Sequence, residues 1–184
     1  MGGSILAKFD FLGNLIYSKS LFYRLSTVCS TKDNGFVVGA GVFRNEIDLG
    51  NGVVIKTPTG NVWGTLVKYN ENDEAEWYQL VGTSMYSVIQ TKDGGYLIGG
   101  YNEGVGVYYN NKYYDSKAGG IVARYDPTGK YQWSIGIGEG DGYNTTVKSI
   151  IEDCHGNYLY GGYYKEDISV GNSKKIENKG EKDG

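Results

Sequence analysis

Proline, cysteine and histidine are scarce in this chain. Its 184 residues include two prolines, two cysteines and one histidine. Cys29 falls in a repeated apolar strand position and Cys154 in a turn, and the two resemble neither a disulfide framework nor a C-x-x-C metal clip. A single histidine, His155, cannot build a tetrahedral metal site with one adjacent cysteine unless further ligands recur, and none do. We therefore expect no metal and no cofactor.

Long apolar runs and an excess of basic charge are also missing. No apolar run approaches the roughly 18 residues that a membrane helix needs. Residues 1–4 open directly into a strand pattern, without the basic region and apolar core of an export signal. The formal net charge of -3 provides no general attraction for nucleic acid or an anionic membrane. The sequence predicts no signal peptide in this chain, no membrane insertion and no nucleic-acid partner.

Glycine and tyrosine, by contrast, are abundant. Thirty glycines and eighteen tyrosines stand against two prolines, a composition typical of short strands joined by tight turns. The length allows one domain, 1–184, with a core of its own, whereas units of about sixty residues would be marginal alone. These features predict an all-β protein.

A unit of about 60 residues is written three times. Asp33, Asp93 and His155 hold equivalent places, 60 and 62 residues apart. The same spacing relates an aromatic-apolar strand ending in glycine, at 36–39, 96–99 and 158–161. An apolar strand ending in Asp or Asn repeats between these, at 6–10, 66–70 and 122–126. Strand-like repeats of this length are typical of β-propellers and solenoids.

Each unit contains four predicted strands and two tight turns. In the middle copy the first hairpin turns at 92–95, where glycine permits a positive φ, and the second at 126–129, where Pro127 and Gly129 suit a β-turn. The predicted strands of this copy are 87–91, 96–101, 121–125 and 131–135. Four antiparallel strands at a fixed period predict one propeller blade.

The units are out of phase with the chain. Residues 5–19 match the third and fourth strands of a unit, and residues 147–164 match the first and second. The approximate repeats are 1–64, 65–120 and 121–184, which give two full blades and two half-blades, or about three blade equivalents. Closed rings usually need four or more blades. Two explanations stay open: a symmetric homodimer that forms a six-bladed ring through its half-blades, or a fragment of a larger propeller.

Several segments resemble one known repeat family. The patterns at 66–69, 91–100 and 121–129, followed by Trp133, resemble the bacterial β-propeller repeat of the SBBP type, and the likeness covers nearly the whole chain. Asp73 stands where that family usually has a turn glycine, and Tyr17 stands where it has tryptophan. The resemblance implies a secreted or cell-surface bacterial propeller without catalytic residues, and hence an extracellular setting for the full-length protein.

Few polar residues fall outside the repeat pattern. His155 lies in a turn position that aspartate fills in the other copies, and Cys154 is next to it, so a turn role is favoured over a catalytic one. Residues 136–142 are rich in glycine but match no phosphate-binding motif, and we interpret them as a connector. A glycoside hydrolase would need two facing carboxylates from the loops; the loop carboxylates are Glu46, Asp48, Glu103, Asp115, Glu139, Asp141, Glu166 and Asp167.

Two sets of residues are candidates for binding. The first is a predicted loop of the middle repeat, rich in tyrosine and asparagine, which suit recognition surfaces but also suit packing against a neighbouring blade; its tyrosines are Tyr108, Tyr109, Tyr113 and Tyr114. The second is expected where the innermost strands begin, near the ring axis; it comprises Tyr23, Arg24, Tyr86, Tyr143 and Asn144.

The sequence thus favours a non-enzymatic β-propeller scaffold that binds a protein or a surface glycan. The alternatives are a carbohydrate-active enzyme that uses the loop carboxylates and a purely structural repeat module.

Overall fold

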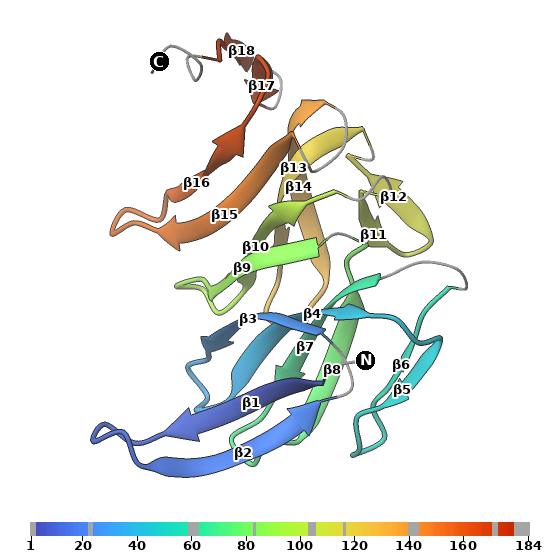
Figure 1. The fold of residues 1–184 in the computed structure, drawn as a ribbon, viewed down its shortest axis with the longest axis vertical. Helices are drawn as coiled ribbons and strands as arrows, with labels where there is room; N and C mark the ends of the chain where they lie inside the picture. The colour runs from blue at the N-terminus through green and yellow to red at the C-terminus, as the bar shows by residue number, and fades with distance from the viewer. Residues whose placement is uncertain are drawn as a thin grey trace.

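The described part of the chain consists of antiparallel β-sheets, as expected from its composition. The computed structural model describes residues 3–21, 24–58, 63–82, 84–102, 106–115, 117–139, 144–170 and 173–178 (Figure 1). Within these ranges there is no helix, and hence none that is long and apolar enough to cross a bilayer. The all-β prediction is confirmed.

Two larger sheets form the middle of the molecule. The first has four strands in the order β3-β4-β7-β8, with β3 at Arg24–Ser30, β4 at Phe36–Val42, β7 at Trp63–Tyr69 and β8 at Ala75–Leu80. The second repeats this order with β9 (Ser84–Gln90), β10 (Tyr96–Tyr101), β13 (Ala118–Tyr125) and β14 (Tyr131–Glu139). In these two units, the four predicted strands are therefore confirmed as neighbours in one sheet.

A two-stranded sheet lies on either side of this pair. The N-terminal half-sheet contains β1 (Ser4–Phe9) and β2 (Leu15–Leu21), and the C-terminal half-sheet contains β15 (Thr145–Glu152) and β16 (Tyr158–Tyr164). Figure 1 shows them at opposite ends of the series of sheets, in blue and in orange to red. By their place in the repeat, β1 and β2 are third and fourth strands, and β15 and β16 are first and second strands, as predicted.

Short hairpins follow the second strand of each unit, where the sequence analysis expected loops. They are β5 (Glu46–Asp48) with β6 (Val54–Lys56), β11 (Val107–Tyr109) with β12 (Lys112–Tyr114), and β17 (Ile168–Val170) with β18 (Ser173–Ile176). The last of these joins the edge of β14, where Val170 pairs with Ile137. The prediction that residues 136–142 form a connector was also partly wrong, because residues 136–139 continue β14. Residues 140–142 lie outside the described residues.

Six tight turns share one hydrogen-bond pattern. In each, the amide of the fourth residue donates to the carbonyl of the first, and the first amide donates to the carbonyl of the fifth, as between Thr91, Gly94 and Gly95. The fourth residue has φ between 62° and 87°, a region in which glycine, asparagine and aspartate are the residues best tolerated. The fourth residues are Gly13, Asn34, Asp73, Gly94, Gly129 and Gly156. Asp73 therefore adopts the turn geometry that glycine usually provides.

A β-bulge recurs in the first strand of each unit. The pairing of β3 with β4, of β9 with β10 and of β15 with β16 skips one residue each time: Ser26, Tyr86 and Lys148. A bulge adds local twist and redirects a side chain out of the regular alternation. The repeat thus places three non-identical side chains at one position of the fold.

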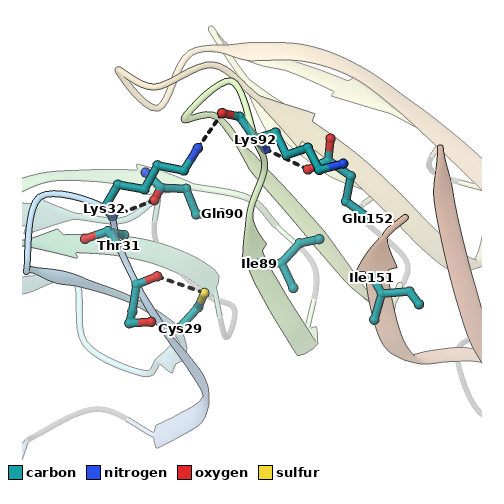
Figure 2. Close-up of a pocket in the computed structure, with 9 residues that line it drawn as sticks. Cys29, Thr31, Lys32, Ile89, Gln90, Lys92, Ile151 and Glu152 are labelled. Carbon is teal, nitrogen blue, oxygen red and sulfur yellow. Dashed lines mark hydrogen bonds between the residues drawn. The ribbon is translucent and has the colours of Figure 1, made fainter. Parts of the chain in front are cut away.

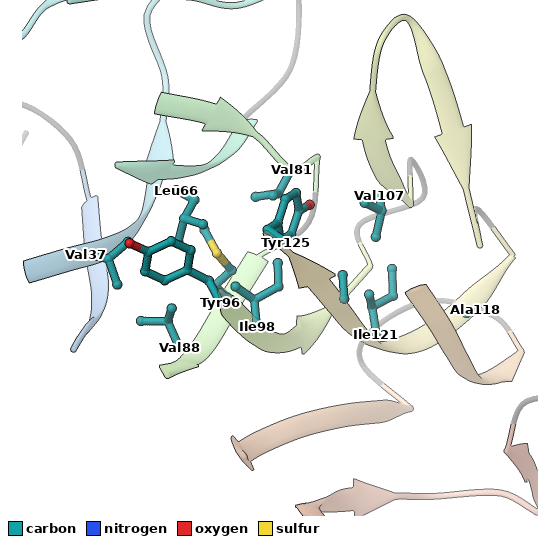
Figure 3. Close-up of a cluster of buried hydrophobic side chains, with 12 residues drawn as sticks. Val37, Leu66, Val81, Val88, Tyr96, Ile98, Val107, Ala118, Ile121 and Tyr125 are labelled. Carbon is teal, nitrogen blue, oxygen red and sulfur yellow. The ribbon is translucent and has the colours of Figure 1, made fainter. Parts of the chain in front are cut away.

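The hydrophobic core fills the three spaces between successive sheets. One cluster joins Val37 and Leu66 of the four-stranded sheet to Val88, Tyr96 and other residues of the next sheet (Figure 3). A second cluster joins the four-stranded sheet to the β5–β6 hairpin, and Leu21 of the N-terminal half-sheet packs against it. A third packs the sheet of β9 to β14 against the C-terminal half-sheet. Each sheet therefore buries both faces only where it has a neighbour on both sides.

Candidate functional site

The first strands of three sheets end at an open pocket. Its volume is about 550 Å³, and its walls come from the C-terminal ends of β3, β9 and β15 (Figure 2). Cys29, Ile89 and Ile151 provide apolar surface from equivalent positions of the three units. The remaining lining residues are polar or charged: Ser30, Thr31, Lys32, Gln90, Lys92 and Glu152. Repeat symmetry therefore builds the pocket from three copies of one strand end.

Hydrogen bonds connect the walls of this pocket from one unit to the next. The amide of Lys32 donates to Oε1 of Gln90 at 2.8 Å, and the amide of Lys92 donates to Oε2 of Glu152 at 2.6 Å. The ammonium groups continue the same relation, since Lys32 donates to the carbonyl of Lys92, and Lys92 donates to that of Asp153 at 2.7 Å. Figure 2 shows the contacts among Lys32, Gln90, Lys92 and Glu152. Both lysine ammonium groups are thus held by main-chain carbonyls, which fixes the rim of the pocket.

Two of the bulge residues, Tyr86 and Lys148, form a second exposed feature of the first strands. Nζ of Lys148 lies 3.3 Å from the ring centroid of Tyr86 and 5.7 Å from that of Tyr163. The rings of Tyr86 and Tyr101 are stacked, with centroids 5.4 Å apart. A cation over an aromatic face is attracted by the ring quadrupole. We call the exposed side of β3, β9 and β15, with the pocket and this aromatic cluster, the first-strand surface.

Only part of the predicted axial set gathers in this cluster. Tyr86 is 39% exposed and belongs to it. Arg24 instead lies over the ring of Phe43, at 5.6 Å, and the carbonyl of Asn144 accepts a hydrogen bond from the amide of Lys165. Tyr23 and Tyr143 lie outside the described residues. Their proposed binding role stays a prediction.

The predicted tyrosines of the middle repeat belong to the β11–β12 hairpin and contact other rings. Tyr108 meets Trp63 edge-on at 4.9 Å, and its hydroxyl donates to Asn111 at 2.7 Å. Tyr114 stacks on Tyr131 at 4.6 Å. The other two rings extend this packing, Tyr109 on Tyr131 and Tyr113 toward Tyr108. Tyr113 is half exposed, so the hairpin combines packing with an available aromatic edge.

The turn aspartates Asp33 and Asp93 have structural partners. Oδ2 of Asp33 lies 2.7 Å from Nζ of the buried Lys68, and Asp93 pairs with Arg124 in the same way one unit later. The hydrogen bond from Lys68 is the main cause that lowers the pKa of Asp33 to about 2. In the third unit His155 replaces this aspartate, and Asp153 instead accepts hydrogen bonds from the amides of His155 and Asn157.

The loop carboxylates that an enzyme would need are dispersed among local contacts. Asp167 pairs with Lys175 at 2.7 Å, Asp115 accepts a hydrogen bond from Ser134, and Asp48 accepts one from the amide of Gly50 at 2.8 Å. The described residues contain no group of three or more His, Cys, Asp or Glu side chains that could hold a metal ion. Of the remaining candidates, Glu46 and Glu166 are exposed, Glu139 ends β14, and Glu103 and Asp141 lie outside the described residues.

Comparison with known proteins adds little to this geometry. No protein-family profile matches the chain, and no curated protein resembles it in sequence. Among solved structures, it is similar to a protein of unknown function from Bacteroides caccae, with 14% sequence identity and a TM-score of 0.35. That alignment covers 86% of this chain and 64% of the other protein. A likeness this weak carries no information on function.

The pocket was not predicted, although its components repeat visibly in the sequence. Lys32 and Lys92 hold equivalent turn positions, and Ser30, Gln90 and Glu152 end the three first strands. The repeat spacing could have indicated that these side chains share one surface. What it could not indicate is the open space between them, because that depends on the angle between successive sheets.

Proposed function

We propose that this chain is a β-propeller-type repeat scaffold that binds a surface glycan or a protein segment at the first-strand surface, without catalysis. The resemblance to bacterial propeller repeats supports the ring arrangement, and it supports an extracellular setting for the full-length protein. The observation that carries the proposal is the pocket at the ends of β3, β9 and β15, where three repeat copies converge.

The chemistry of the surface supports a ligand with many hydroxyl or amide groups. Ser30 and Glu152 offer hydrogen-bonding groups beside the apolar side chains of Ile89 and Ile151, whereas the amide of Gln90 is already bonded to Lys32 and Gly94. Binding pockets commonly combine apolar walls with a few placed polar groups. The aromatic cluster adds two exposed rings, Tyr86 on β9 and Tyr163 on β16, against which a sugar ring or an aromatic side chain can stack. The pocket favours a small anion less than such a ligand, because the lysine ammonium groups at its rim already donate to main-chain carbonyls.

A glycan array, followed by titration of a hit oligosaccharide under NMR, tests the proposal. Binding without turnover of that sugar or of model glycosides supports it. Turnover would favour the enzyme alternative, and the absence of any glycan or protein ligand would favour a purely structural role.

Two matched variants distinguish binding at the pocket from binding elsewhere on the molecule. Ile151 is 55% exposed at the pocket, so Ile151→Lys should abolish binding there with little effect on stability. Ile135→Lys is the control, because Ile135 is 40% exposed on β14 and the first unit carries Lys19 at the same position. Equal loss of binding in both variants would contradict the assignment of the pocket.

A further inference from the structure

The outward face of the C-terminal half-sheet leaves exposed an apolar position that the complete sheets bury. Leu159 of β16 is 49% exposed, whereas its equivalents Val37 and Leu97 are 0% exposed. In both complete sheets this residue lies in a cluster with a first-strand residue of the next sheet: Val37 with Val88, and Leu97 with Ile150. At the position of Leu159, burial therefore requires the first strand of a following sheet, as in the two complete sheets.

An exposed apolar side chain of the matching kind lies on the first strand of the N-terminal part of the molecule. Val28 of β3 is 55% exposed, although its equivalents Val88 and Ile150 are 4% and 2% exposed. The residue that would cover Val28 is the second-strand residue of a preceding sheet, which is the place that Leu159 holds in the repeat. Leu159 and Val28 are thus the two partners of one contact. The chain makes this contact twice internally, between Val37 and Val88 and between Leu97 and Ile150.

Glycine positions show the same relation. A Cβ atom on Gly99 would lie 2.5 Å from Cδ1 of Ile150 and 2.6 Å from Cγ1 of Val147, both on the next sheet. Gly161 holds the equivalent place on β16, and nothing lies within 4 Å of its Cβ position. Close approach of two sheets requires glycine at such a position. The sequence keeps glycine at position 161, although no sheet approaches it within the described part of the single chain.

The strand edges are complementary too. In the part of the chain that the structure describes, β1 pairs only with β2, and β16 pairs only with β15. In both complete sheets the edge of the second strand pairs with the third strand. The exposure of β1 agrees with the absence, among the described residues, of a second strand of the repeat beside it. Ile5 is 71% exposed, whereas its equivalent Ile121 is 0% exposed.

We propose that two copies of this chain associate by pairing β16 of each with β1 of the other. The registers of β4 with β7 and of β10 with β13 fix the alignment, which places Gly161 opposite Leu6 and Tyr160 opposite Ala7. Two such junctions related by a two-fold axis complete two four-stranded sheets and give a closed ring of six sheets. Closure removes both exposed edges, which otherwise invite uncontrolled pairing.

One end of this junction differs from the intrachain pairs. Asn157 replaces Gly35 and Gly95, at which a Cβ atom would lie 2.2 Å and 2.6 Å from the carbonyl oxygens of Tyr69 and Tyr125. The pairing therefore extends from Leu159 to Tyr163 and stops before the turn. His155 also replaces the aspartate that elsewhere pairs with Lys68 or Arg124, so the junction lacks that ion pair. These differences make the association reversible and dependent on concentration.

Sedimentation equilibrium over a wide concentration range gives the first test. The assembly rests on the ring arrangement proposed above, but it does not depend on a ligand, so glycan binding and self-association can fail separately. We expect a shift from 20.2 kDa to twice that mass as concentration rises. A monomer at every concentration overturns the proposal, and so does an open series of larger oligomers, because heterologous pairing gives filaments rather than a closed pair.

Charge substitutions test the contact between Leu159 and Val28. Leu159→Lys and Val28→Glu should each weaken self-association about a hundredfold or more, because each buries an unpaired charge at both junctions. Both residues are about half exposed in the single chain, so its folding should be unaffected. Ile135→Lys is the matched control and should associate like the wild type.

Mixing the two charge variants tests the two-fold geometry. In a mixed pair one junction places Lys against Glu and the other keeps the original leucine and valine, so a heterodimer should form from two chains that do not pair with themselves. Failure of the mixture to associate overturns the assigned contact. Gly161→Val gives an independent check, since the added side chain has free space in one chain and none at the junction; self-association of this variant at wild-type strength also overturns the proposal.

Discussion

The substitution Gly99→Ala tests how tightly successive sheets pack. The new methyl group would lie 2.6 Å from Cγ1 of Val147, a short side chain that is 1% exposed and cannot turn away. It would also lie 2.5 Å from Cδ1 of Ile150, whose side chain is 2% exposed. One sheet must therefore move away from the other, or both side chains must leave their preferred rotamers.

Two opposing effects set the size of the change. Overpacking a core typically costs about 1–3 kcal/mol. Replacing glycine by alanine lowers the entropy of the unfolded chain, which stabilises the folded protein by about 0.4–1 kcal/mol. The net expectation for Gly99→Ala is a loss of about 1–2 kcal/mol in the free energy of unfolding. Urea denaturation measures it as a lower midpoint with an unchanged slope.

Gly161→Ala is the matched control. It makes the same chemical change at the equivalent position of the next unit, where nothing lies within 4 Å of the new methyl group. At concentrations where the chain is monomeric, only the unfolded-state effect remains, so the variant should be about 0.4–1 kcal/mol more stable than wild type. If Gly99→Ala is as stable as wild type, or if both variants lose stability equally, the two sheets are not packed tightly at Gly99.

Three further predictions concern burial, an unpaired hydroxyl and acid stability. Leu97→Ala should cost about 2–5 kcal/mol because Leu97 is fully buried, whereas Leu159→Ala should change the stability of the monomer by about 0.5 kcal/mol or less; thermal denaturation compares them. Tyr125→Phe should leave stability unchanged or raise it by urea denaturation, because the buried hydroxyl of Tyr125 has no hydrogen-bond partner among the described residues. Lys68 lowers the pKa of Asp33 from 3.8 to about 2, so the pair stabilises the fold above pH 3.8 and this contribution is lost as the pH falls through about 2. Asp33→Asn should therefore lose less stability than wild type between these pH values, and a steeper loss would contradict the pairing.

The strands and turns of this protein could be predicted from its sequence because their causes are local. The strand predicted at 96–101 is found at Tyr96–Tyr101, and the turn at Asp126 closes with Gly129 at a positive φ, as its composition indicated. Repetition strengthened each inference, since three copies of one pattern had to share one structure. Even the half-sheets at both ends were evident from the phase of the repeat.

Other features escaped the sequence analysis because they depend on distant contacts. The hairpin of β11 and β12 was expected as a loop, since its strands of three residues are too short to show an alternating pattern. Packing of its rings against a neighbouring blade was one interpretation of the sequence, but no local signal indicates Trp63 and Tyr131 as the partners. The pocket requires side chains from three units that lie 60 or more residues apart in sequence.

The sequence by itself determined the repeating unit, its hydrogen-bonded turns and the order of its strands, because glycine, aspartate and alternating apolar residues act over a few residues. Only the tertiary structure decided which equivalent residues became core and which stayed exposed. Leu97 and Leu159 have the same local sequence role, yet one is buried and the other is half exposed. The reason is that burial depends on whether another sheet lies opposite, which no residue can specify alone.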